Sequence, residues 1–175
     1  MSTQYEEFKS GNVTLRLING NVIKNASADT VFLDPAGSAF YGSYGKQTWG
    51  GGGVSGVLYD YAIKHDSTLD VTRMDTILTP EEYNKIKQRK GACYKKYDNC
   101  AIIHVVSMNF GGEIMTDNEI RAELTKSYSH VFEEYNSKIK GINDFRMVTL
   151  SGAIFSGMYK DKILKMTPSV ICNVL

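Results

Sequence analysis

A run of glycines that leads directly into a predicted helix is the first feature of this sequence that could do chemistry. Eight of the 16 glycines lie between Gly37 and Gly56. Glycine lets the backbone approach a ligand closely and adopt positive φ, and the first N–H groups of a helix are unpaired at its positive dipole end. This combination suits a phosphate or diphosphate; the alternative is an ordinary surface loop. The candidate ligand-binding residues are Gly50, Gly51, Gly52, Gly53, Val54, Ser55 and Gly56.

A second stretch of small residues has the same position relative to a strand and a helix. It follows a predicted strand at 145–150 and precedes a predicted helix at 158–165. Its backbone N–H groups could hold the same phosphates from the opposite side, and the alternative is an ordinary turn. Two such loops in one small domain favour a diphosphate ligand. The candidate residues are Ser151, Gly152, Ala153, Ile154, Phe155 and Ser156.

The elements that would position these loops alternate between strand and helix. Capping boxes at Thr79 and Thr116 predict helices that end near Lys90 and Ile139, and a further helix begins near Val54. The alternation predicts an α/β layered sheet with helices on both faces. Ligands of such sheets bind outside the carboxyl ends of the strands. The predicted strands are 13–18, 30–33, 101–106, 145–150 and 169–174.

Length, charge and hydropathy exclude several classes of protein. The 175 residues are expected to form a single domain, 1–175. Lys and Arg number 20 and Asp and Glu 19, so the net charge of +1 gives no basic excess for nucleic-acid binding. The mean hydropathy is −0.25, and no apolar run approaches the roughly 20 residues of a membrane span. We therefore expect neither a nucleic-acid nor a membrane partner.

The cysteines and the first residues bear on cofactors and location. Cys93, Cys100 and Cys172 form no CxxC pair and no metal-ligand spacing, so we expect no metal and no cofactor. An odd number of cysteines fits a reduced compartment, and the beginning of the sequence shows no secretory signal. A cytoplasmic location is expected, with the nucleus, or the host cytoplasm for a viral chain, as alternatives.

The sequence resembles the macro domain family at four places that follow the family's order. Gly20-Asn21-Val22 is similar to the family's Gly-Asp-Ile/Val, and residues 50–56 are similar to its Gly-Gly-Gly-Val-x-Gly diphosphate loop. Residues 101–106 resemble its Val-Ile-His-x-Val strand, and residues 151–157 resemble its Ser-Thr-Gly-Ile-Phe-Gly loop. The resemblance implies a three-layer α/β/α sandwich with a central mixed sheet that binds ADP-ribose. It adds Asn21 and Val22 to the candidate ligand-binding residues.

The departures from the family pattern bear on activity. Asn21 replaces the acid that contacts adenine, and Gly37 replaces an asparagine that orients the distal ribose in active members. The chain also stops after the last predicted strand, where the family adds a helix. Asp34 is the only carboxylate near the expected distal ribose and could act as the general base; the alternative is that it ends a strand at an Asp-Pro turn. His104 is expected to be a satisfied core residue.

Three functions follow from these observations. The first is binding of an ADP-ribose-type small molecule, or of an ADP-ribosylated protein. The second is a hydrolase that removes ADP-ribose from protein, or phosphate from ADP-ribose 1″-phosphate, with Asp34 as its catalytic residue. The third is a ligand-free macro-like domain with a structural or interaction role, which the departures at Asn21 and Gly37 motivate.

Overall fold

A mixed sheet of four strands forms the centre of the protein. The computed structural model describes residues 5–10, 13–18, 20–36, 53–63, 66, 68, 77–112, 114–141 and 144–175. In these ranges the sheet has the strand order β4 (Cys93–Lys96), β5 (Ala101–Val106), β3 (Val31–Ala36) and β6 (Phe145–Arg146). β3 pairs in parallel with β5 and β6, and β4 pairs antiparallel with β5. The predicted mixed sheet is confirmed.

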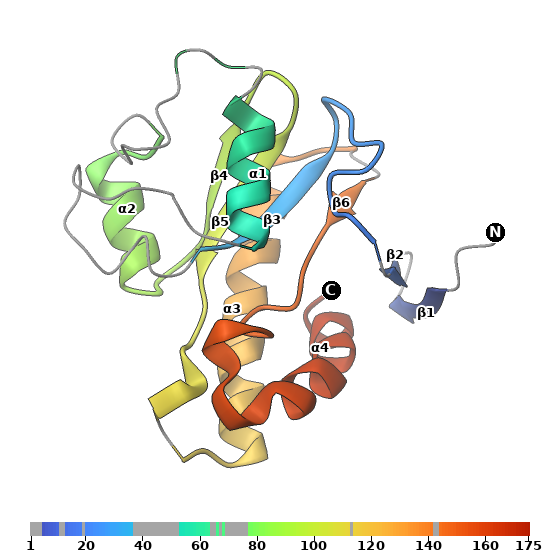
Figure 1. Cartoon of the computed structure of the whole chain (residues 1–175), viewed down its shortest axis with the longest axis vertical. Coiled ribbons are helices and arrows are strands. Elements are labelled where there is room, and N and C mark those ends of the chain that lie inside the picture. Colours follow the sequence, from blue (N-terminus) through green and yellow to red (C-terminus); the bar gives the residue numbers. More distant parts are fainter. Residues whose placement is uncertain are drawn as a thin grey trace.

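Helices cover both faces of this sheet, as the alternating pattern predicts. Val31, Leu33 and Ile103 point to the face on which α3 (Asp117–Lys138) and α4 (Lys160–Val174) complete one core. The intervening side chains Phe32 and Ile102 enter a second core with α1 (Val54–Ile63) and α2 (Pro80–Lys87). Figure 1 shows α1 in front of the strands and the fainter α3 behind them. All six residues of β5 are buried because both of its faces are covered.

The two predicted helix starts at capping boxes are confirmed. The Thr79 hydroxyl accepts a hydrogen bond from the Glu82 backbone N–H, and the Glu82 side chain accepts one from the Thr79 N–H. Thr116 and Glu119 form the same reciprocal pair at the start of α3. Each box satisfies N–H groups that a helix start leaves without a partner.

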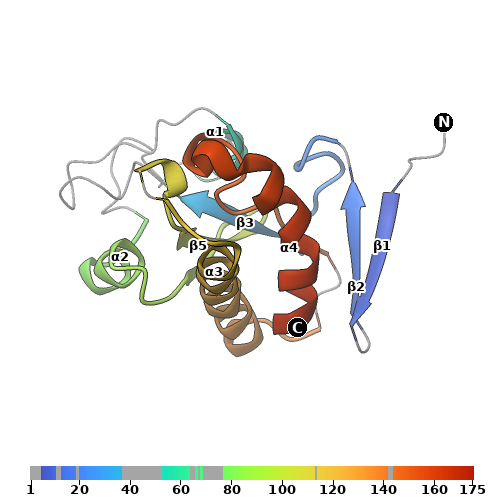
Figure 2. The same cartoon turned by 90° about the horizontal axis from the view of Figure 1, so that it is seen from below.

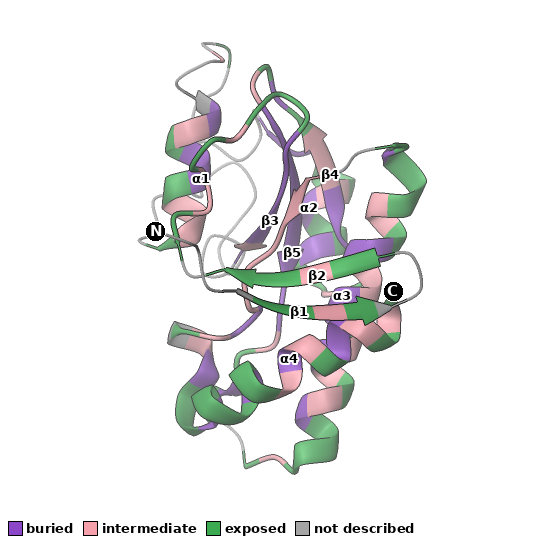
Figure 3. Cartoon of the chain, turned by 90° about the vertical axis from the view of Figure 1, so that its right-hand side faces the viewer, coloured by how far each residue is buried: buried purple, intermediate pink, exposed green. Residues whose placement is uncertain are grey.

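The first predicted strand is a strand, but it lies outside the central sheet. β2 (Val13–Ile18) pairs antiparallel with β1 (Tyr5–Ser10), and the two form a separate two-stranded sheet. β1 contacts α4. Figure 3 shows this β1–β2 hairpin mainly in the colour of exposed residues, whereas β3 and β5 are buried. The sequence pattern predicts the strand correctly but not its partner.

The prediction of a last strand at 169–174 is wrong. These residues belong to α4, which is the terminal helix of the chain and replaces the expected short helix at 158–165. Ile163, Thr167, Val170 and Ile171 are buried at intervals of a helical face, so burial overrides the strand preference of β-branched residues. Pro168 lies inside the helix instead of ending it. The expectation that the chain stops without a final helix is therefore wrong as well.

The Asp-Pro turn predicts that β3 ends at Asp34, and this prediction is wrong. The strand continues through Asp34 and Pro35 to Ala36. Among the described residues, β6 pairs with β3 only at Val31 and Phe32, which leaves the rest of β3 as an edge on that side, where proline is tolerated. In the part of the chain that is described, no helix is long and apolar enough to cross a membrane.

Candidate ligand-binding site

The start of α1 comes directly after a glycine whose backbone has positive φ. Gly53 precedes the helix with φ +79°, a conformation that glycine adopts without strain, and its carbonyl accepts the N–H of Val57 at 3.2 Å. A Cβ added to Gly53 would meet no described atom within 4 Å. Val54, Ser55 and Gly56 form the first turn of α1, whose N–H groups have no partner earlier in the helix. Gly50, Gly51 and Gly52 lie outside the described residues.

The second predicted loop is held in place by its own side chains. Ser151 has φ +54°, and its hydroxyl contacts the hydroxyl of Ser107 at 2.8 Å and the carbonyl of Met108 at 2.5 Å. The Ser156 hydroxyl donates to the carbonyl of Ala153 at 2.5 Å. Ala153 is exposed, and the loop continues into the 3₁₀ helix η4 (Ile154–Tyr159). Phe155 is half-buried within η4.

A third loop that the sequence analysis did not single out supports the second one. It follows β5 and contains the short 3₁₀ helix η3 (Phe110–Gly112). Gly157 in η4 approaches it so closely that a Cβ there would lie 2.8 Å from the Cα of Gly111 and 2.9 Å from the carbonyl oxygen of Phe110. The position of this glycine-containing stretch directly after a buried strand is the signal that could have identified it.

These loops follow the carboxyl ends of neighbouring strands. β3 and β5 run in parallel, so the segments after Ala36 and Val106 leave the sheet at the same edge. Figure 2 shows the arrowhead of β3 pointing toward η3 and the first turns of the red C-terminal segment. This edge is where ligands of open α/β sheets bind.

A buried carboxylate lies directly beneath the start of α1. Asp34 and His104 are register partners on β3 and β5, and their side chains are both completely buried. The ring Nδ1 of His104 is 2.8 Å from Asp34 Oδ2, and the Tyr59 hydroxyl donates to the same oxygen. The Ser55 hydroxyl donates to Asp34 Oδ1 at 2.5 Å. One carboxylate thus joins β3, β5 and α1.

Two tyrosines complete this buried cluster, which we call the Asp34 cluster: Ser55, Tyr59, Asp34, His104 and Tyr97. The Tyr97 hydroxyl lies 3.2 Å from His104 Nε2, and the rings of Tyr59 and His104 are stacked. Burial raises the pKa of the Tyr59 phenol well above its usual value, and the Asp34 carboxylate raises it further. Burial and the same carboxylate raise the pKa of Tyr97. Both phenols therefore keep their protons at neutral pH and can donate them.

The Asp34 cluster changes the interpretation of two residues. His104 is a satisfied core residue, as expected. Asp34 does not fit the expected general base, because a base must reach the proton that it removes, and this carboxylate is completely buried with both oxygens accepting hydrogen bonds. The alternative that Asp34 ends its strand is wrong, because β3 continues to Ala36.

Asn21 and Val22 lie in the segment that precedes β3. The Asn21 side-chain oxygen accepts the N–H of Ile23 at 3.1 Å, and the Val22 carbonyl accepts from Arg146 Nη1 at 2.7 Å. Arg146 is the register partner of Phe32, at the beginning of β3. The loops described above follow the ends of the strands instead. Val22 packs against the same core as Val54 at the start of α1, but the described hydrogen bonds do not join Asn21 or Val22 to those loops.

The cysteines and carboxylates do not gather into a metal site within the described ranges. No group of three His, Cys, Asp or Glu side chains there could hold an ion. Burial raises the pKa of Cys93 to about 12 and that of Cys100 to about 11. Both thiols are thus protonated at neutral pH, whereas a metal ligand or nucleophile needs the thiolate.

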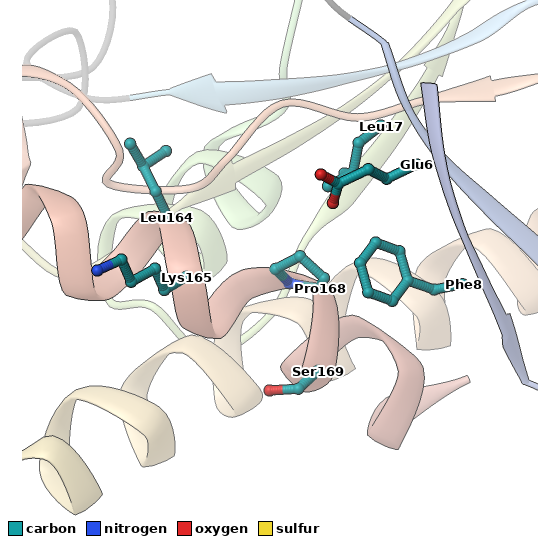
Figure 4. Close-up of a pocket in the computed structure, with 7 residues that line it drawn as sticks. All are labelled: Glu6, Phe8, Leu17, Leu164, Lys165, Pro168 and Ser169. Carbon is teal, nitrogen blue, oxygen red and sulfur yellow. The ribbon is translucent and has the colours of Figure 1, made fainter. Parts of the chain in front are cut away.

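A groove of about 440 Å³ lies elsewhere, between the hairpin and α4. Figure 4 shows Phe8 and Leu17 from the hairpin facing Pro168 and Leu164 of α4. Glu6, Lys165 and Ser169 complete its lining. The groove has none of the glycine-rich backbone of the α1 start, and its lining is mainly apolar.

The comparisons with known proteins support the fold. No family model and no curated protein matches the sequence. The structure is similar to that of a macrodomain mutant from Oceanobacillus iheyensis, with a TM-score of 0.57 and 14% identity over 99% of this chain and 80% of that chain. At this identity the likeness concerns the fold alone. The chain therefore has a macrodomain-like α/β fold.

Proposed function

We propose that this protein binds ADP-ribose or a closely related derivative, with its diphosphate between the start of α1 and the loop Ser151–Ser156. The observation that carries the proposal is the helix start at Gly53, which comes after β3 in the chain and has positive φ, and whose first-turn N–H groups have no partner earlier in the helix. The second loop begins with the strained backbone of Ser151. The macrodomain-like fold supports the same ligand class.

Binding is favoured over hydrolysis by the state of Asp34. A hydrolase needs a general base that reaches a water molecule or the substrate. Asp34, the candidate for this role, is completely buried within the Asp34 cluster, which favours binding.

A charge-insertion experiment tests this proposal. Titration calorimetry with ADP-ribose is compared for the wild type, Ala153→Glu and Ala122→Glu. Ala153 is exposed in the second loop, and Ala122 is exposed on α3. A carboxylate beside a bound diphosphate repels it, so we expect Ala153→Glu to weaken binding about tenfold or more. Ala122→Glu makes the same chemical change far along the chain from the loops and should leave the affinity unchanged.

Two outcomes would contradict the proposal. One is that the wild type gives neither heat nor a thermal shift with millimolar ADP-ribose, which would favour a structural or interaction role. The other is that ADP-ribose binds equally well to the wild type and to Ala153→Glu, which would place the ligand elsewhere.

A further inference from the structure

The hydroxyl group of Ser55 donates its proton to a buried side chain. Ser55 is half-buried in the first turn of α1, two residues after Gly53. Its Oγ donates to Asp34 Oδ1 at 2.5 Å, and the Asp34 side chain is completely buried. A serine hydroxyl has one proton and two lone pairs. The direction of this hydrogen bond therefore decides what Ser55 can offer to a ligand above it.

The other partners of Asp34 fix that direction. An ionised carboxylate only accepts hydrogen bonds. Asp34 Oδ2 already has two partners: the Tyr59 hydroxyl donates to it, and His104 Nδ1 lies 2.8 Å away. Tyr59 remains protonated because burial raises its pKa. Asp34 Oδ1 accepts from Ser55, and within the described residues no other donor is seen at this oxygen.

We propose that Asp34 fixes Ser55 as a hydrogen-bond acceptor, so that Ser55 recognises a hydroxyl or amino group of the ligand and not a phosphate oxygen. This inference rests on the proposed function, because it concerns the same site. On the α1 side of the site, the phosphate oxygens are then bound by backbone N–H groups and not by the Ser55 hydroxyl. A lone pair of Ser55 selects for a ligand that carries a donor next to its phosphates, such as a ribose hydroxyl.

The substitution Asp34→Asn reverses this arrangement while keeping the shape of the side chain. The amide oxygen can accept from Tyr59 and His104, and the amide NH₂ can donate to Ser55. The Ser55 hydroxyl can then turn its proton toward the ligand site and donate it in a hydrogen bond to a phosphate oxygen. Ser55→Ala removes the hydroxyl in either background, so the two substitutions form a double-mutant cycle.

Calorimetric titration with two ligands measures the affinity of each of the four proteins in the cycle. Inorganic pyrophosphate presents acceptor oxygens, and ADP-ribose adds hydroxyl donors. In the wild type, we expect Ser55→Ala to leave pyrophosphate affinity within about twofold and to weaken ADP-ribose about fivefold, the effect of one hydrogen bond. In the Asp34→Asn background, Ser55→Ala should weaken pyrophosphate about fivefold. Thermal melts of all four proteins establish that each is folded.

Equal losses of pyrophosphate affinity on Ser55→Ala in both backgrounds would overturn the inference, because Ser55 would then donate to phosphate regardless of Asp34. A second measurement needs no ligand: the Ser55 hydroxyl proton should exchange slowly in NMR spectra of the wild type and rapidly in Asp34→Asn. Rapid exchange in the wild type would also overturn the inference. If no variant binds either ligand, the proposed function fails, and the ligand role of Ser55 fails with it, even when the Ser55 proton exchanges slowly. If the ligands bind but the losses of pyrophosphate affinity are equal in both backgrounds, only the inference about Ser55 fails.

Discussion

The centre of the sheet and the β1–β2 hairpin are both built from short strands, yet they differ in what surrounds them. β3 and β5 are covered on both faces, and even their polar side chains Asp34 and His104 are completely buried and paired. The hairpin has exposed residues on both faces, and its Arg16–Glu7 ion pair lies in solvent. Both regions have paired strands, so we expect the coverage by helices to make the central strands the more stable part of the fold.

The largest expected effect comes from one substitution made in each region. Leu33 is completely buried in β3, whereas Leu17 in β2 is 37% exposed. We expect Leu33→Ala to lower the free energy of unfolding by about 2–5 kcal/mol, because it leaves a cavity in the core. Leu17→Ala should cost under about 1 kcal/mol. Urea denaturation measures both values. Similar losses for the two variants would show that the hairpin belongs to the same core.

A smaller effect concerns the Asp34 cluster at alkaline pH. The pKa of Tyr59 is higher in the folded state, so folding holds this proton more tightly. The stabilisation is complete below the unfolded value of about 10 and is lost as the pH rises above it. One buried phenol lowers the free energy of unfolding by up to about 1.4 kcal/mol per pH unit in that range.

Urea denaturation between pH 8 and 11 measures this slope, and Tyr59→Phe should reduce it. The absorbance of tyrosinate reports tyrosine ionisation directly. The part of it that is lost in Tyr59→Phe should rise with pH only when the protein unfolds. A wild-type stability that stays constant up to pH 11 would contradict the burial of these phenols. The hairpin provides the comparison, since its charged side chains are in contact with solvent.

The smallest effect is expected in the hairpin itself. The Arg16 guanidinium lies 2.8 Å from the Glu7 carboxylate, with 56% and 34% of the two side chains exposed. Solvent screening leaves such a pair with little net energy, so Glu7→Gln should change the free energy of unfolding by under about 0.5 kcal/mol. Thermal or urea denaturation with and without 1 M salt measures this change, because 1 M salt shortens the screening length to roughly 3 Å. A loss above about 1 kcal/mol would mean that the hairpin contributes more to stability than its exposure indicates.

The parts of the fold that the sequence predicts are those with local causes. The capping boxes at Thr79 and Thr116 use residues three positions apart, and β5 is a continuous apolar run. The segment 169–174 has two causes in conflict, and packing at helical intervals outweighs its strand preference. The partner of β2 depends on distant contacts that no short pattern contains.

The candidate site shows the same division. The start of α1 at Val54 is predicted from the glycines before it. The role of Asp34 is not, because it depends on the register that places Asp34 beside His104, 70 residues away in the sequence. The support of Ser151 by Ser107 and Met108 likewise joins segments more than 40 residues apart.

Arg146 links the irregular segment 20–30 to β6. The segment 20–30 contains no helix and no strand, and Arg146 donates to its carbonyls at Val22, Lys24 and Asn25. Because three carbonyls of this segment converge on one guanidinium, we expect the segment to loosen as a unit when that guanidinium is removed. Amide exchange across 20–30 should therefore accelerate together, ahead of global unfolding, and would report the loss of a single guanidinium.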